Sequence, residues 1–290
     1  MKKITNKYID YISKSYAGLI GLSIARIGIG LATLIILLSC FPIRKDIWTT
    51  TYLRVHHIDF GNYFDLFYFL CIIVTVFFIL GIESYIFNII VFVTITILYQ
   101  SNIYILDGGN NLVSIILFYM LFTKNAQYFS LYKGKISNNK ILIAMHNLFY
   151  FLIIFQVCTV YFFAGLAKAR GNMWIHGTAP YYIFNLDSFS MQPLQFITQL
   201  LVKSTFMITL ISYLAIFTQL LFPIMLFNKY TKIFAIIGSI CFHFSIIIFM
   251  GLVPFGITMI ALDLSLISDN VYRNLSSSIA KLKLRRNKHA

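Results

Sequence analysis

Long apolar runs separated by short polar stretches dominate this chain. About 20 consecutive apolar residues are enough for a helix to cross the hydrocarbon core of a bilayer. By that criterion we expect eight membrane-spanning helices, at residues 18–40, 64–81, 85–105, 112–129, 141–167, 206–227, 233–250 and 253–267. The fourth of these carries the weakest signal. The pattern therefore predicts an all-α fold, a polytopic helical transmembrane bundle.

The two ends of the chain depart from this pattern. Residues 1–17 are basic, and apolar side chains recur at every fourth position within 4–16, which predicts an amphipathic helix in the membrane interface. Residues 268–290 are polar and basic, and we expect them to form a cytoplasmic tail. No internal repeat and no Pro/Gly/Ser-rich linker divides the sequence, so residues 1–290 are predicted to form a single transmembrane domain.

Composition supports a membrane location. The chain is 59% hydrophobic and only 11% charged, whereas a soluble domain carries about 25% charged residues. Its net charge of +14 would suggest nucleic acid in a soluble protein, but here the basic residues flank apolar runs, where they meet anionic lipid instead. We therefore expect a multi-pass protein of the cell membrane with no nucleic-acid partner. The four cysteines lie in or beside apolar runs, and their spacing predicts neither a disulfide nor a metal site.

The distribution of basic residues predicts an orientation. With eight spans and a cytoplasmic N-terminus, the inner segments hold 16 of the 23 lysines and arginines, and the outer loops hold six. Because positive charge accumulates on the cytoplasmic side of membrane proteins, both termini are predicted to be cytoplasmic. The loop that follows residue 167 is then extracellular.

That loop begins with the densest group of polar side chains in the sequence. The apolar run of residues 141–167 leads directly into Lys168, Arg170, Trp174 and His176. Ionisable groups at the end of a spanning helix are costly unless they are solvated or paired, so they indicate a functional surface. In the alternative interpretation, the two basic side chains extend to lipid headgroups and the tryptophan belongs to an interfacial aromatic belt.

Arg26 lies inside the first predicted span. An arginine on a lipid-facing surface is costly, so we expect it to point into the bundle toward a partner. The candidate partners are Asp107, Asp187 or backbone carbonyls at a broken helix. Alternatively, Arg26 lies near the inner interface and extends to it.

Three further polar sites fall in or between apolar runs. The sequence Asp-Gly-Gly-Asn-Asn at 107–111 predicts a turn whose amides could hold a polar ligand, although a plain loop has the same signature. His243 is a lone histidine within an apolar run, typical either of a satisfied structural group or of a functional one. Asp263, near the end of the last run, carries the same two interpretations.

The segment from Gln156 to Gly177 reads Gln-x4-Tyr-Phe-x-Ala-Gly-x2-Lys followed by Trp-x2-Gly, which places Tyr161, Lys168 and Trp174 in the pattern. This pattern closely resembles the core of the HTTM family, which includes the membrane domain of vitamin K-dependent gamma-carboxylases and the SdpB-like (sporulation-delaying protein B) proteins. The resemblance extends to residues 25–28, 106–111 and 242–256.

The resemblance implies roles for particular residues. The lysine of the carboxylase that matches Lys168 is its proposed base, and a lysine packed against Phe162 and Phe163 would lose solvation, which favours the neutral amine that accepts a proton. His243 is the second predicted catalytic residue. The predicted contacts to a substrate or cofactor are Arg26, Asn110, Asn111, Gln156, Tyr161, Arg170, Trp174, His176 and Gly177, and no metal is expected.

Two functions follow from the resemblance. Leu112 stands where the carboxylase has a functional histidine, and the chain lacks that enzyme's large soluble domain, so the compact form resembles SdpB. That subgroup implies maturation or export of a secreted antimicrobial peptide, with a peptide precursor and an accessory protein as partners. The alternative is a carboxylase-like enzyme that uses the lysine base with a reduced quinone as cofactor. A small-solute transporter is disfavoured because no inverted repeat is visible.

Overall fold

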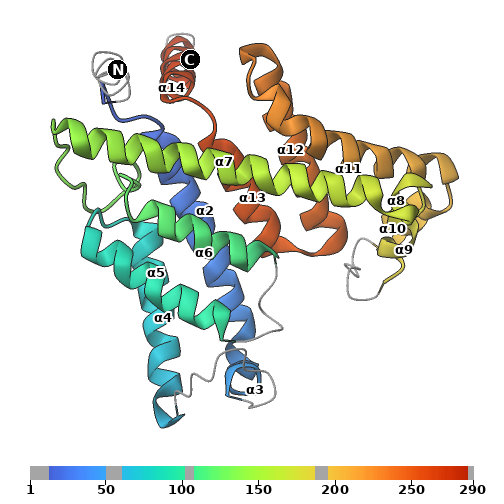
Figure 1. The fold of residues 1–290 in the computed structure, drawn as a ribbon, viewed down its shortest axis with the longest axis horizontal. Coiled ribbons are helices and arrows are strands. Elements are labelled where there is room, and N and C mark those ends of the chain that lie inside the picture. The colour runs from blue at the N-terminus through green and yellow to red at the C-terminus, as the bar shows by residue number, and fades with distance from the viewer. Residues whose placement is uncertain (1–12, 50–60, 102–107, 187–194, 287–290) are drawn as a thin grey trace, which may run out of the picture. The chain divides into compact units, whose positions relative to one another are not determined.

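The computed structural model describes residues 13–49, 61–101, 108–186 and 195–286. Within these residues the regular elements are helices, beside an isolated bridge between Ile82 and Tyr132. The helices are α2 (Leu19–Cys40), η1 (Phe41–Ile43), α3 (Arg44–Trp48), η3 (Gly61–Tyr63), α4 (Phe64–Leu80), α5 (Tyr85–Gln100), α6 (Gly108–Met120), α7 (Lys140–Arg170), α8 (Asn172–Ile175), α9 (Ala179–Phe184), α10 (Gln195–Val202), α11 (Thr205–Met225), α12 (Lys229–Met250), α13 (Val253–Ser265) and α14 (Asp269–Arg286) (Figure 1). The all-α prediction is confirmed for the described residues.

Every predicted span coincides with a helix, but the helices differ in length. Five described stretches are long and apolar enough to cross a membrane: Leu19–Trp48, Gly61–Leu80, Lys140–Arg170, Thr205–Met225 and Lys229–Met250. Helices α5, α6 and α13 have 16, 13 and 13 residues. A helix rises about 1.5 Å per residue, so these three are shorter than the roughly 30 Å hydrocarbon core. The structure therefore supports five long candidate spans in its described part.

Large apolar side chains remain exposed along the long helices. Examples are Leu214 and Phe217 on α11, each 55% exposed, and Phe234 on α12, which is 68% exposed. Exposed apolar surface on this scale is favourable in contact with the hydrocarbon of a membrane and unfavourable in contact with water. Helices can cross that hydrocarbon because they satisfy their own backbone polar groups. The protein is a multi-pass membrane protein.

The chain forms two compact units. Unit 1 comprises residues Met1–Gly30, Arg44–Leu152 and Leu264–Ala290, and unit 2 comprises Leu31–Ile43 and Ile153–Asp263. In unit 1, α5 packs against both α4 and α6, as Figure 1 shows. In unit 2, α11 packs against α8, α9, α10 and α12. The single-domain prediction for residues 1–290 stays a prediction.

The predicted span at 112–129 is shifted, and Arg26 explains why. The helix runs from Gly108 to Met120, and residues 121–129 follow as turns and irregular chain. Arg26 is 1% exposed, and its guanidinium donates to five carbonyl oxygens. These belong to Phe78 (2.5 Å), Ile79 (2.7 Å), Asn125 (3.1 Å), Tyr128 (3.4 Å) and Phe129 (2.7 Å). Arg26 thus supplies hydrogen-bond donors to backbone carbonyls that would otherwise be costly to leave unpaired in an apolar surrounding.

The N-terminal ends of α2 and α14 meet at one carboxylate, that of Asp269. The Asp269 side chain, in the first turn of α14, accepts hydrogen bonds from the backbone N–H groups of Leu19 (3.0 Å) and Ile20 (2.9 Å). These amides belong to the first turn of α2 and have no partner within their own helix. Asp269 therefore caps α2 from 250 positions away. Most of the predicted amphipathic segment at 4–16, together with Asp107 and Asp187, lies outside the described residues.

Candidate functional site

The C-terminal end of α7 carries the polar group that the sequence singles out. The helix ends at Arg170, because the backbone of Gly171 is extended (φ −83°, ψ 123°). Gly171 is also the N-cap of the short helix α8. Gly177 follows with φ +71°, a left-handed conformation, and a Cβ there would lie 2.9 Å from Thr209 Cγ2 on α11. A glycine is required on both grounds. The chain therefore turns sharply against α11 directly after Trp174.

Hydroxyl groups of α11 hold this turn in place. Ser212 Oγ donates to the carbonyl of Trp174 at 2.9 Å, and the Tyr213 hydroxyl donates to the carbonyl of Ile175 at 2.7 Å. Both carbonyls are among the last of α8, and the Trp174 carbonyl also accepts from the Gly177 N–H at 3.1 Å. Trp174 is therefore held in place by hydrogen bonds between α8 and α11, and not only by contacts of its ring.

Behind this turn lies a cavity of about 320 Å³ in unit 2. The Lys168 ammonium reaches it and lies 5.2 Å from the centroid of the Trp174 ring, in a cation–π contact. No Asp or Glu carboxylate of the described residues forms an ion pair with Lys168. Other walls are mostly apolar and aromatic, among them Val160, Ala164, Ile183, Phe184, Phe242, Phe249 and Phe255.

A buried hydrogen-bonded cluster forms one wall of the cavity. Tyr161 on α7 donates to both oxygens of Asp263 on α13, at 2.9 and 2.8 Å, and also contacts Ser239 Oγ on α12. Ser239 in turn donates to Asp263 Oδ2 at 2.5 Å. His243 Nε2 lies 2.9 Å from the Tyr161 hydroxyl. All four side chains are at most 1% exposed, so the cluster is buried.

The cluster determines which nitrogen of His243 is free. With Asp263 ionised, the single proton of the Tyr161 hydroxyl is donated to that carboxylate, and His243 Nε2 is then the donor of the hydrogen bond to Tyr161. A neutral imidazole protonated at Nε2 presents Nδ1 as an acceptor. Nδ1 is buried and has no partner among the described residues, and His243 lines the cavity. The assignment of the tautomer follows from the hydrogen-bond network.

Gln219 supplies a second free acceptor. It lines the same cavity, is 6% exposed, and its Oε1 has no partner in the described chain. Close packing brings it there: a Cβ on Gly165 of α7 would lie 2.8 Å from the backbone N of Leu220. An apolar cavity lined by a lysine, a histidine and a glutamine suits an amphipathic molecule with a few hydrogen-bonding groups.

The structure brings together some of the predicted site residues and separates others. Those that line the cavity are Tyr161, Lys168, Trp174 and His243. Gly177 is buried beside it, whereas Arg170 and His176 are exposed and Gln156 is half-buried on α7, none of them lining the cavity. Arg26, Asn110 and Asn111 belong to unit 1.

Arg26 has no hydrogen-bond donor left for a ligand, because an arginine has five N–H groups and five carbonyls are bound. Asn110 is buried and Asn111 is exposed, both on α6. Among the described residues, no group of three or more His, Cys, Asp or Glu side chains could hold a metal ion.

Two residues of the site carried only a weak sequence signal. Gln219 stands within the apolar run of α11, and a polar side chain inside a span suggests a functional position. Ser239 has no distinctive pattern around it. What joins them to Lys168 is the packing of α7, α11, α12 and α13, which their spacing along the chain does not reveal.

Comparison with known proteins gives one match. No curated protein and no solved structure matches this chain. The model of the HTTM domain matches residues 22–268, which is most of the sequence and contains every residue of the cavity and its buried cluster. The chain therefore belongs to the HTTM domain family of membrane proteins.

Proposed function

We propose that this HTTM-domain protein is SdpB-like and acts in the maturation or export of a secreted antimicrobial peptide, with the Lys168 cavity as its reaction site. The observation that carries the proposal is the unpaired ammonium of Lys168 in an apolar cavity beside two free acceptors, His243 Nδ1 and Gln219 Oε1. A structural lysine at a helix end would be paired or solvated. Partners of this function are a peptide precursor and an accessory maturation protein.

The cavity supports a base role for Lys168. Removing an ammonium from water without a counterion favours its neutral form, and a neutral amine accepts a proton. The neutral Lys168 amine can take a proton, and His243 Nδ1 can accept a hydrogen bond. Both residues line the same cavity, so they can engage the same small molecule.

A second candidate function is quinone-linked chemistry at the same cavity. The specific observation in its favour is that both free polar atoms are acceptors, while the surrounding walls are apolar and aromatic. A reduced quinone has two hydroxyl donors on an apolar ring, so these residues fit it. When bound, it would supply reducing equivalents, and Lys168 would accept a hydroxyl proton.

The peptide function predicts a change in what cells secrete. Deleting the gene should remove one small peptide from the culture medium, or leave it with an altered mass, because its maturation is interrupted; mass spectrometry of the medium checks this. The wild-type chain supplied in trans should restore the peptide. An unchanged set of secreted peptides would contradict this function. Oxidation of an added short-chain naphthohydroquinone by the purified protein would then favour the quinone-linked alternative.

We further propose that α5, α6 and α13 complete eight crossings, so that both termini are cytoplasmic and Lys168 is near the outer face. Single cysteines at the exposed positions Asn138, Asn172 and Ser277, in a chain without its four native cysteines, test this orientation. An impermeant maleimide added to intact cells should label Asn172→Cys alone. If only the five long helices cross, Ser277→Cys also becomes labelled, because an odd number of crossings puts the two termini on opposite sides.

A further inference from the structure

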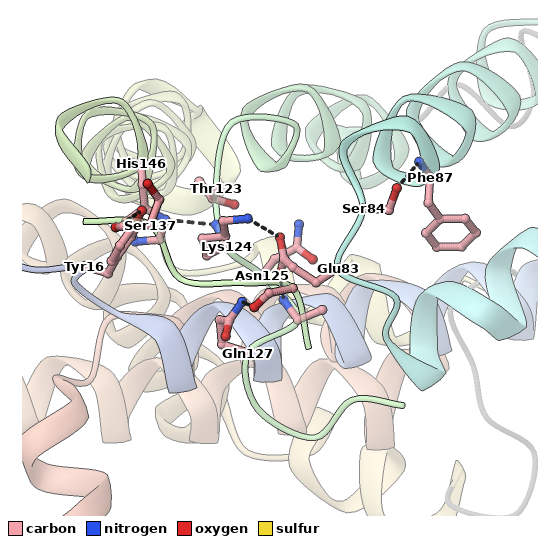
Figure 2. Close-up of polar contacts among 12 residues, drawn as sticks. Tyr16, Glu83, Ser84, Phe87, Thr123, Lys124, Asn125, Gln127, Ser137 and His146 are labelled. Atoms are coloured by element: carbon pink, nitrogen blue, oxygen red, sulfur yellow. Dashed lines mark hydrogen bonds and ion pairs between the residues drawn. The ribbon is translucent and has the colours of Figure 1, made fainter. Parts of the chain in front are cut away.

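Unit 1 contains a second cavity, of about 230 Å³, that the proposed function does not use. It lies among the start of α5, the chain that follows α6 and the start of α7. Figure 2 shows its polar wall, with Lys124 between His146 and Glu83. The cavity is lined by Tyr16, Glu83, Tyr85, Asn88, Leu121, Phe122, Thr123, Lys124, Leu142, Met145 and His146.

Glu83 brings a negative charge to the inner part of this cavity. Its side chain is only 3% exposed, and Oε2 accepts a hydrogen bond from the Ala126 amide at 2.7 Å. Oε1 lies 3.6 Å from the Lys124 ammonium, too far for a strong hydrogen bond. Burial raises the pKa of the Glu83 carboxyl, and the Ala126 amide and Lys124 act in the opposite direction. The carboxylate therefore has capacity for a closer cationic donor.

Asn88 also lines this cavity and has a side-chain oxygen without a partner. This residue of α5 is 5% exposed, and its Oδ1 has no hydrogen-bond partner in the described part of the chain. A buried amide oxygen without a partner costs stability, so its retention needs a reason. A donor that entered the cavity would satisfy it.

Two other polar side chains of the wall, His146 and Tyr16, are already hydrogen-bonded within the protein. His146 Nδ1 accepts from the Lys124 backbone N–H at 2.9 Å, so its Nε2 donates to the Ala17 carbonyl at 2.8 Å. The Tyr16 hydroxyl donates to the Ser137 carbonyl at 3.0 Å. The groups that can still engage a ligand include one carboxylate oxygen of Glu83, the side-chain amide of Asn88 and the ammonium of Lys124, which is 30% exposed.

These groups require a ligand that has a cationic donor and an anion side by side. A primary ammonium would donate to Glu83 Oε1 and to Asn88 Oδ1, and an adjoining phosphate would contact the more exposed Lys124. The remaining walls are apolar, and two of them, Tyr85 (56% exposed) and Leu142 (40% exposed), face outward from a protein whose surroundings are lipid. An acyl chain fits beside such walls, whereas a wholly soluble ligand would leave them unused.

We propose that this cavity binds the ethanolamine headgroup of a phospholipid. Choline and glycerol headgroups fit these polar groups less well, for different reasons. A choline headgroup has no N–H to donate to Glu83 and Asn88. A glycerol headgroup has only neutral hydroxyl donors, so it brings no cationic donor closer to Glu83 Oε1 than the Lys124 ammonium at 3.6 Å.

The test is a titration of the purified full-length protein with dihexanoyl lipids below their micelle concentrations, followed by calorimetry. Phosphatidylethanolamine should bind about tenfold or more tightly than phosphatidylcholine and phosphatidylglycerol, because each lacks at least one charge-assisted hydrogen bond. Asn88→Leu, which removes an acceptor that has no internal partner to lose, should weaken the binding of phosphatidylethanolamine by a similar factor while the protein stays folded.

Thr96→Val is the matched control. Thr96 is on the same helix, and its buried hydroxyl oxygen also has no partner among the described residues, but it does not line the cavity. Its substitution should leave lipid binding unchanged. Equal binding of the three lipids, or equal losses in both variants, would overturn the proposal and leave a cavity that holds only water. Binding of O-phosphoethanolamine as tight as that of the lipid would overturn the assignment to a phospholipid.

Discussion

Replacing Lys168 with arginine should reduce peptide output by about 100-fold or more, the range typical of losing a general base. The substitution keeps the positive charge and the contact with the Trp174 ring, which is 5.2 Å from the ammonium. Arginine remains protonated at any accessible pH, so it cannot accept a proton. The measurement is the amount of mature peptide in the medium at matched membrane abundance of the two proteins.

Lys203→Arg is the control for this experiment. Lys203 is exposed in the turn before α11 and does not line the cavity, so the same chemical change there should have no effect. Near-normal output from Lys168→Arg would exclude the base role and leave a lysine that anchors a ligand or contacts lipid phosphate. Loss of output from both variants would point to a general sensitivity to arginine rather than to chemistry in the cavity.

Removing the Tyr161 hydroxyl should have the second-largest effect. Tyr161→Phe leaves Asp263 with one donor fewer and His243 Nε2 without a partner, in a site where all the side chains are at most 1% exposed. Buried polar groups left unpaired cost roughly 1–3 kcal/mol, so the thermal stability of the purified protein should fall. Peptide output should fall as well, because the His243 ring that lines the cavity loses the hydrogen bond that orients it.

A spectroscopic measurement separates positioning from general destabilisation. In ¹⁵N spectra of His-labelled protein, His243 should be protonated at Nε2 in the wild type and should lose this preference in Tyr161→Phe, with His243→Gln used to assign its signal. Tyr182→Phe, at a position 55% exposed, is the control and should change neither the spectrum nor the stability. A His243 signal that is identical in wild type and Tyr161→Phe would contradict the proposed role of the cluster.

The helices were largely predictable, because apolar periods and lengths depend on local sequence. Residues 112–129 show where this reasoning fails. Leu121 and Phe122 add to the apolar count, but the helix ends at Met120. The carbonyls at 125, 128 and 129 then bind Arg26, which lies about a hundred positions earlier in the chain. A window over the local sequence cannot detect a donor that reaches the backbone from another helix.

The candidate site was predictable only in part, and for the same reason. Lys168 and Trp174 stand out because charge and an aromatic ring follow an apolar run without a spacer. His243 was recognisable as a polar group in a span, but whether it was structural or functional remained open. In the structure His243 Nε2 is hydrogen-bonded to Tyr161, whereas Nδ1 is buried without a partner among the described residues, and the residue lines the cavity. That division depends on Asp263, whose partners lie on other helices.

The carboxylate of Asp269 has a consequence for the order of events during synthesis. The first span of the chain emerges from the ribosome long before residue 269 exists, so the amides of Leu19 and Ile20 must first be satisfied by water or lipid headgroups. Only when nearly the whole protein has been translated can the cap form. The first helix is thus capped by a residue close to the C-terminus. A nascent chain truncated before residue 269 would insert this helix without its cap.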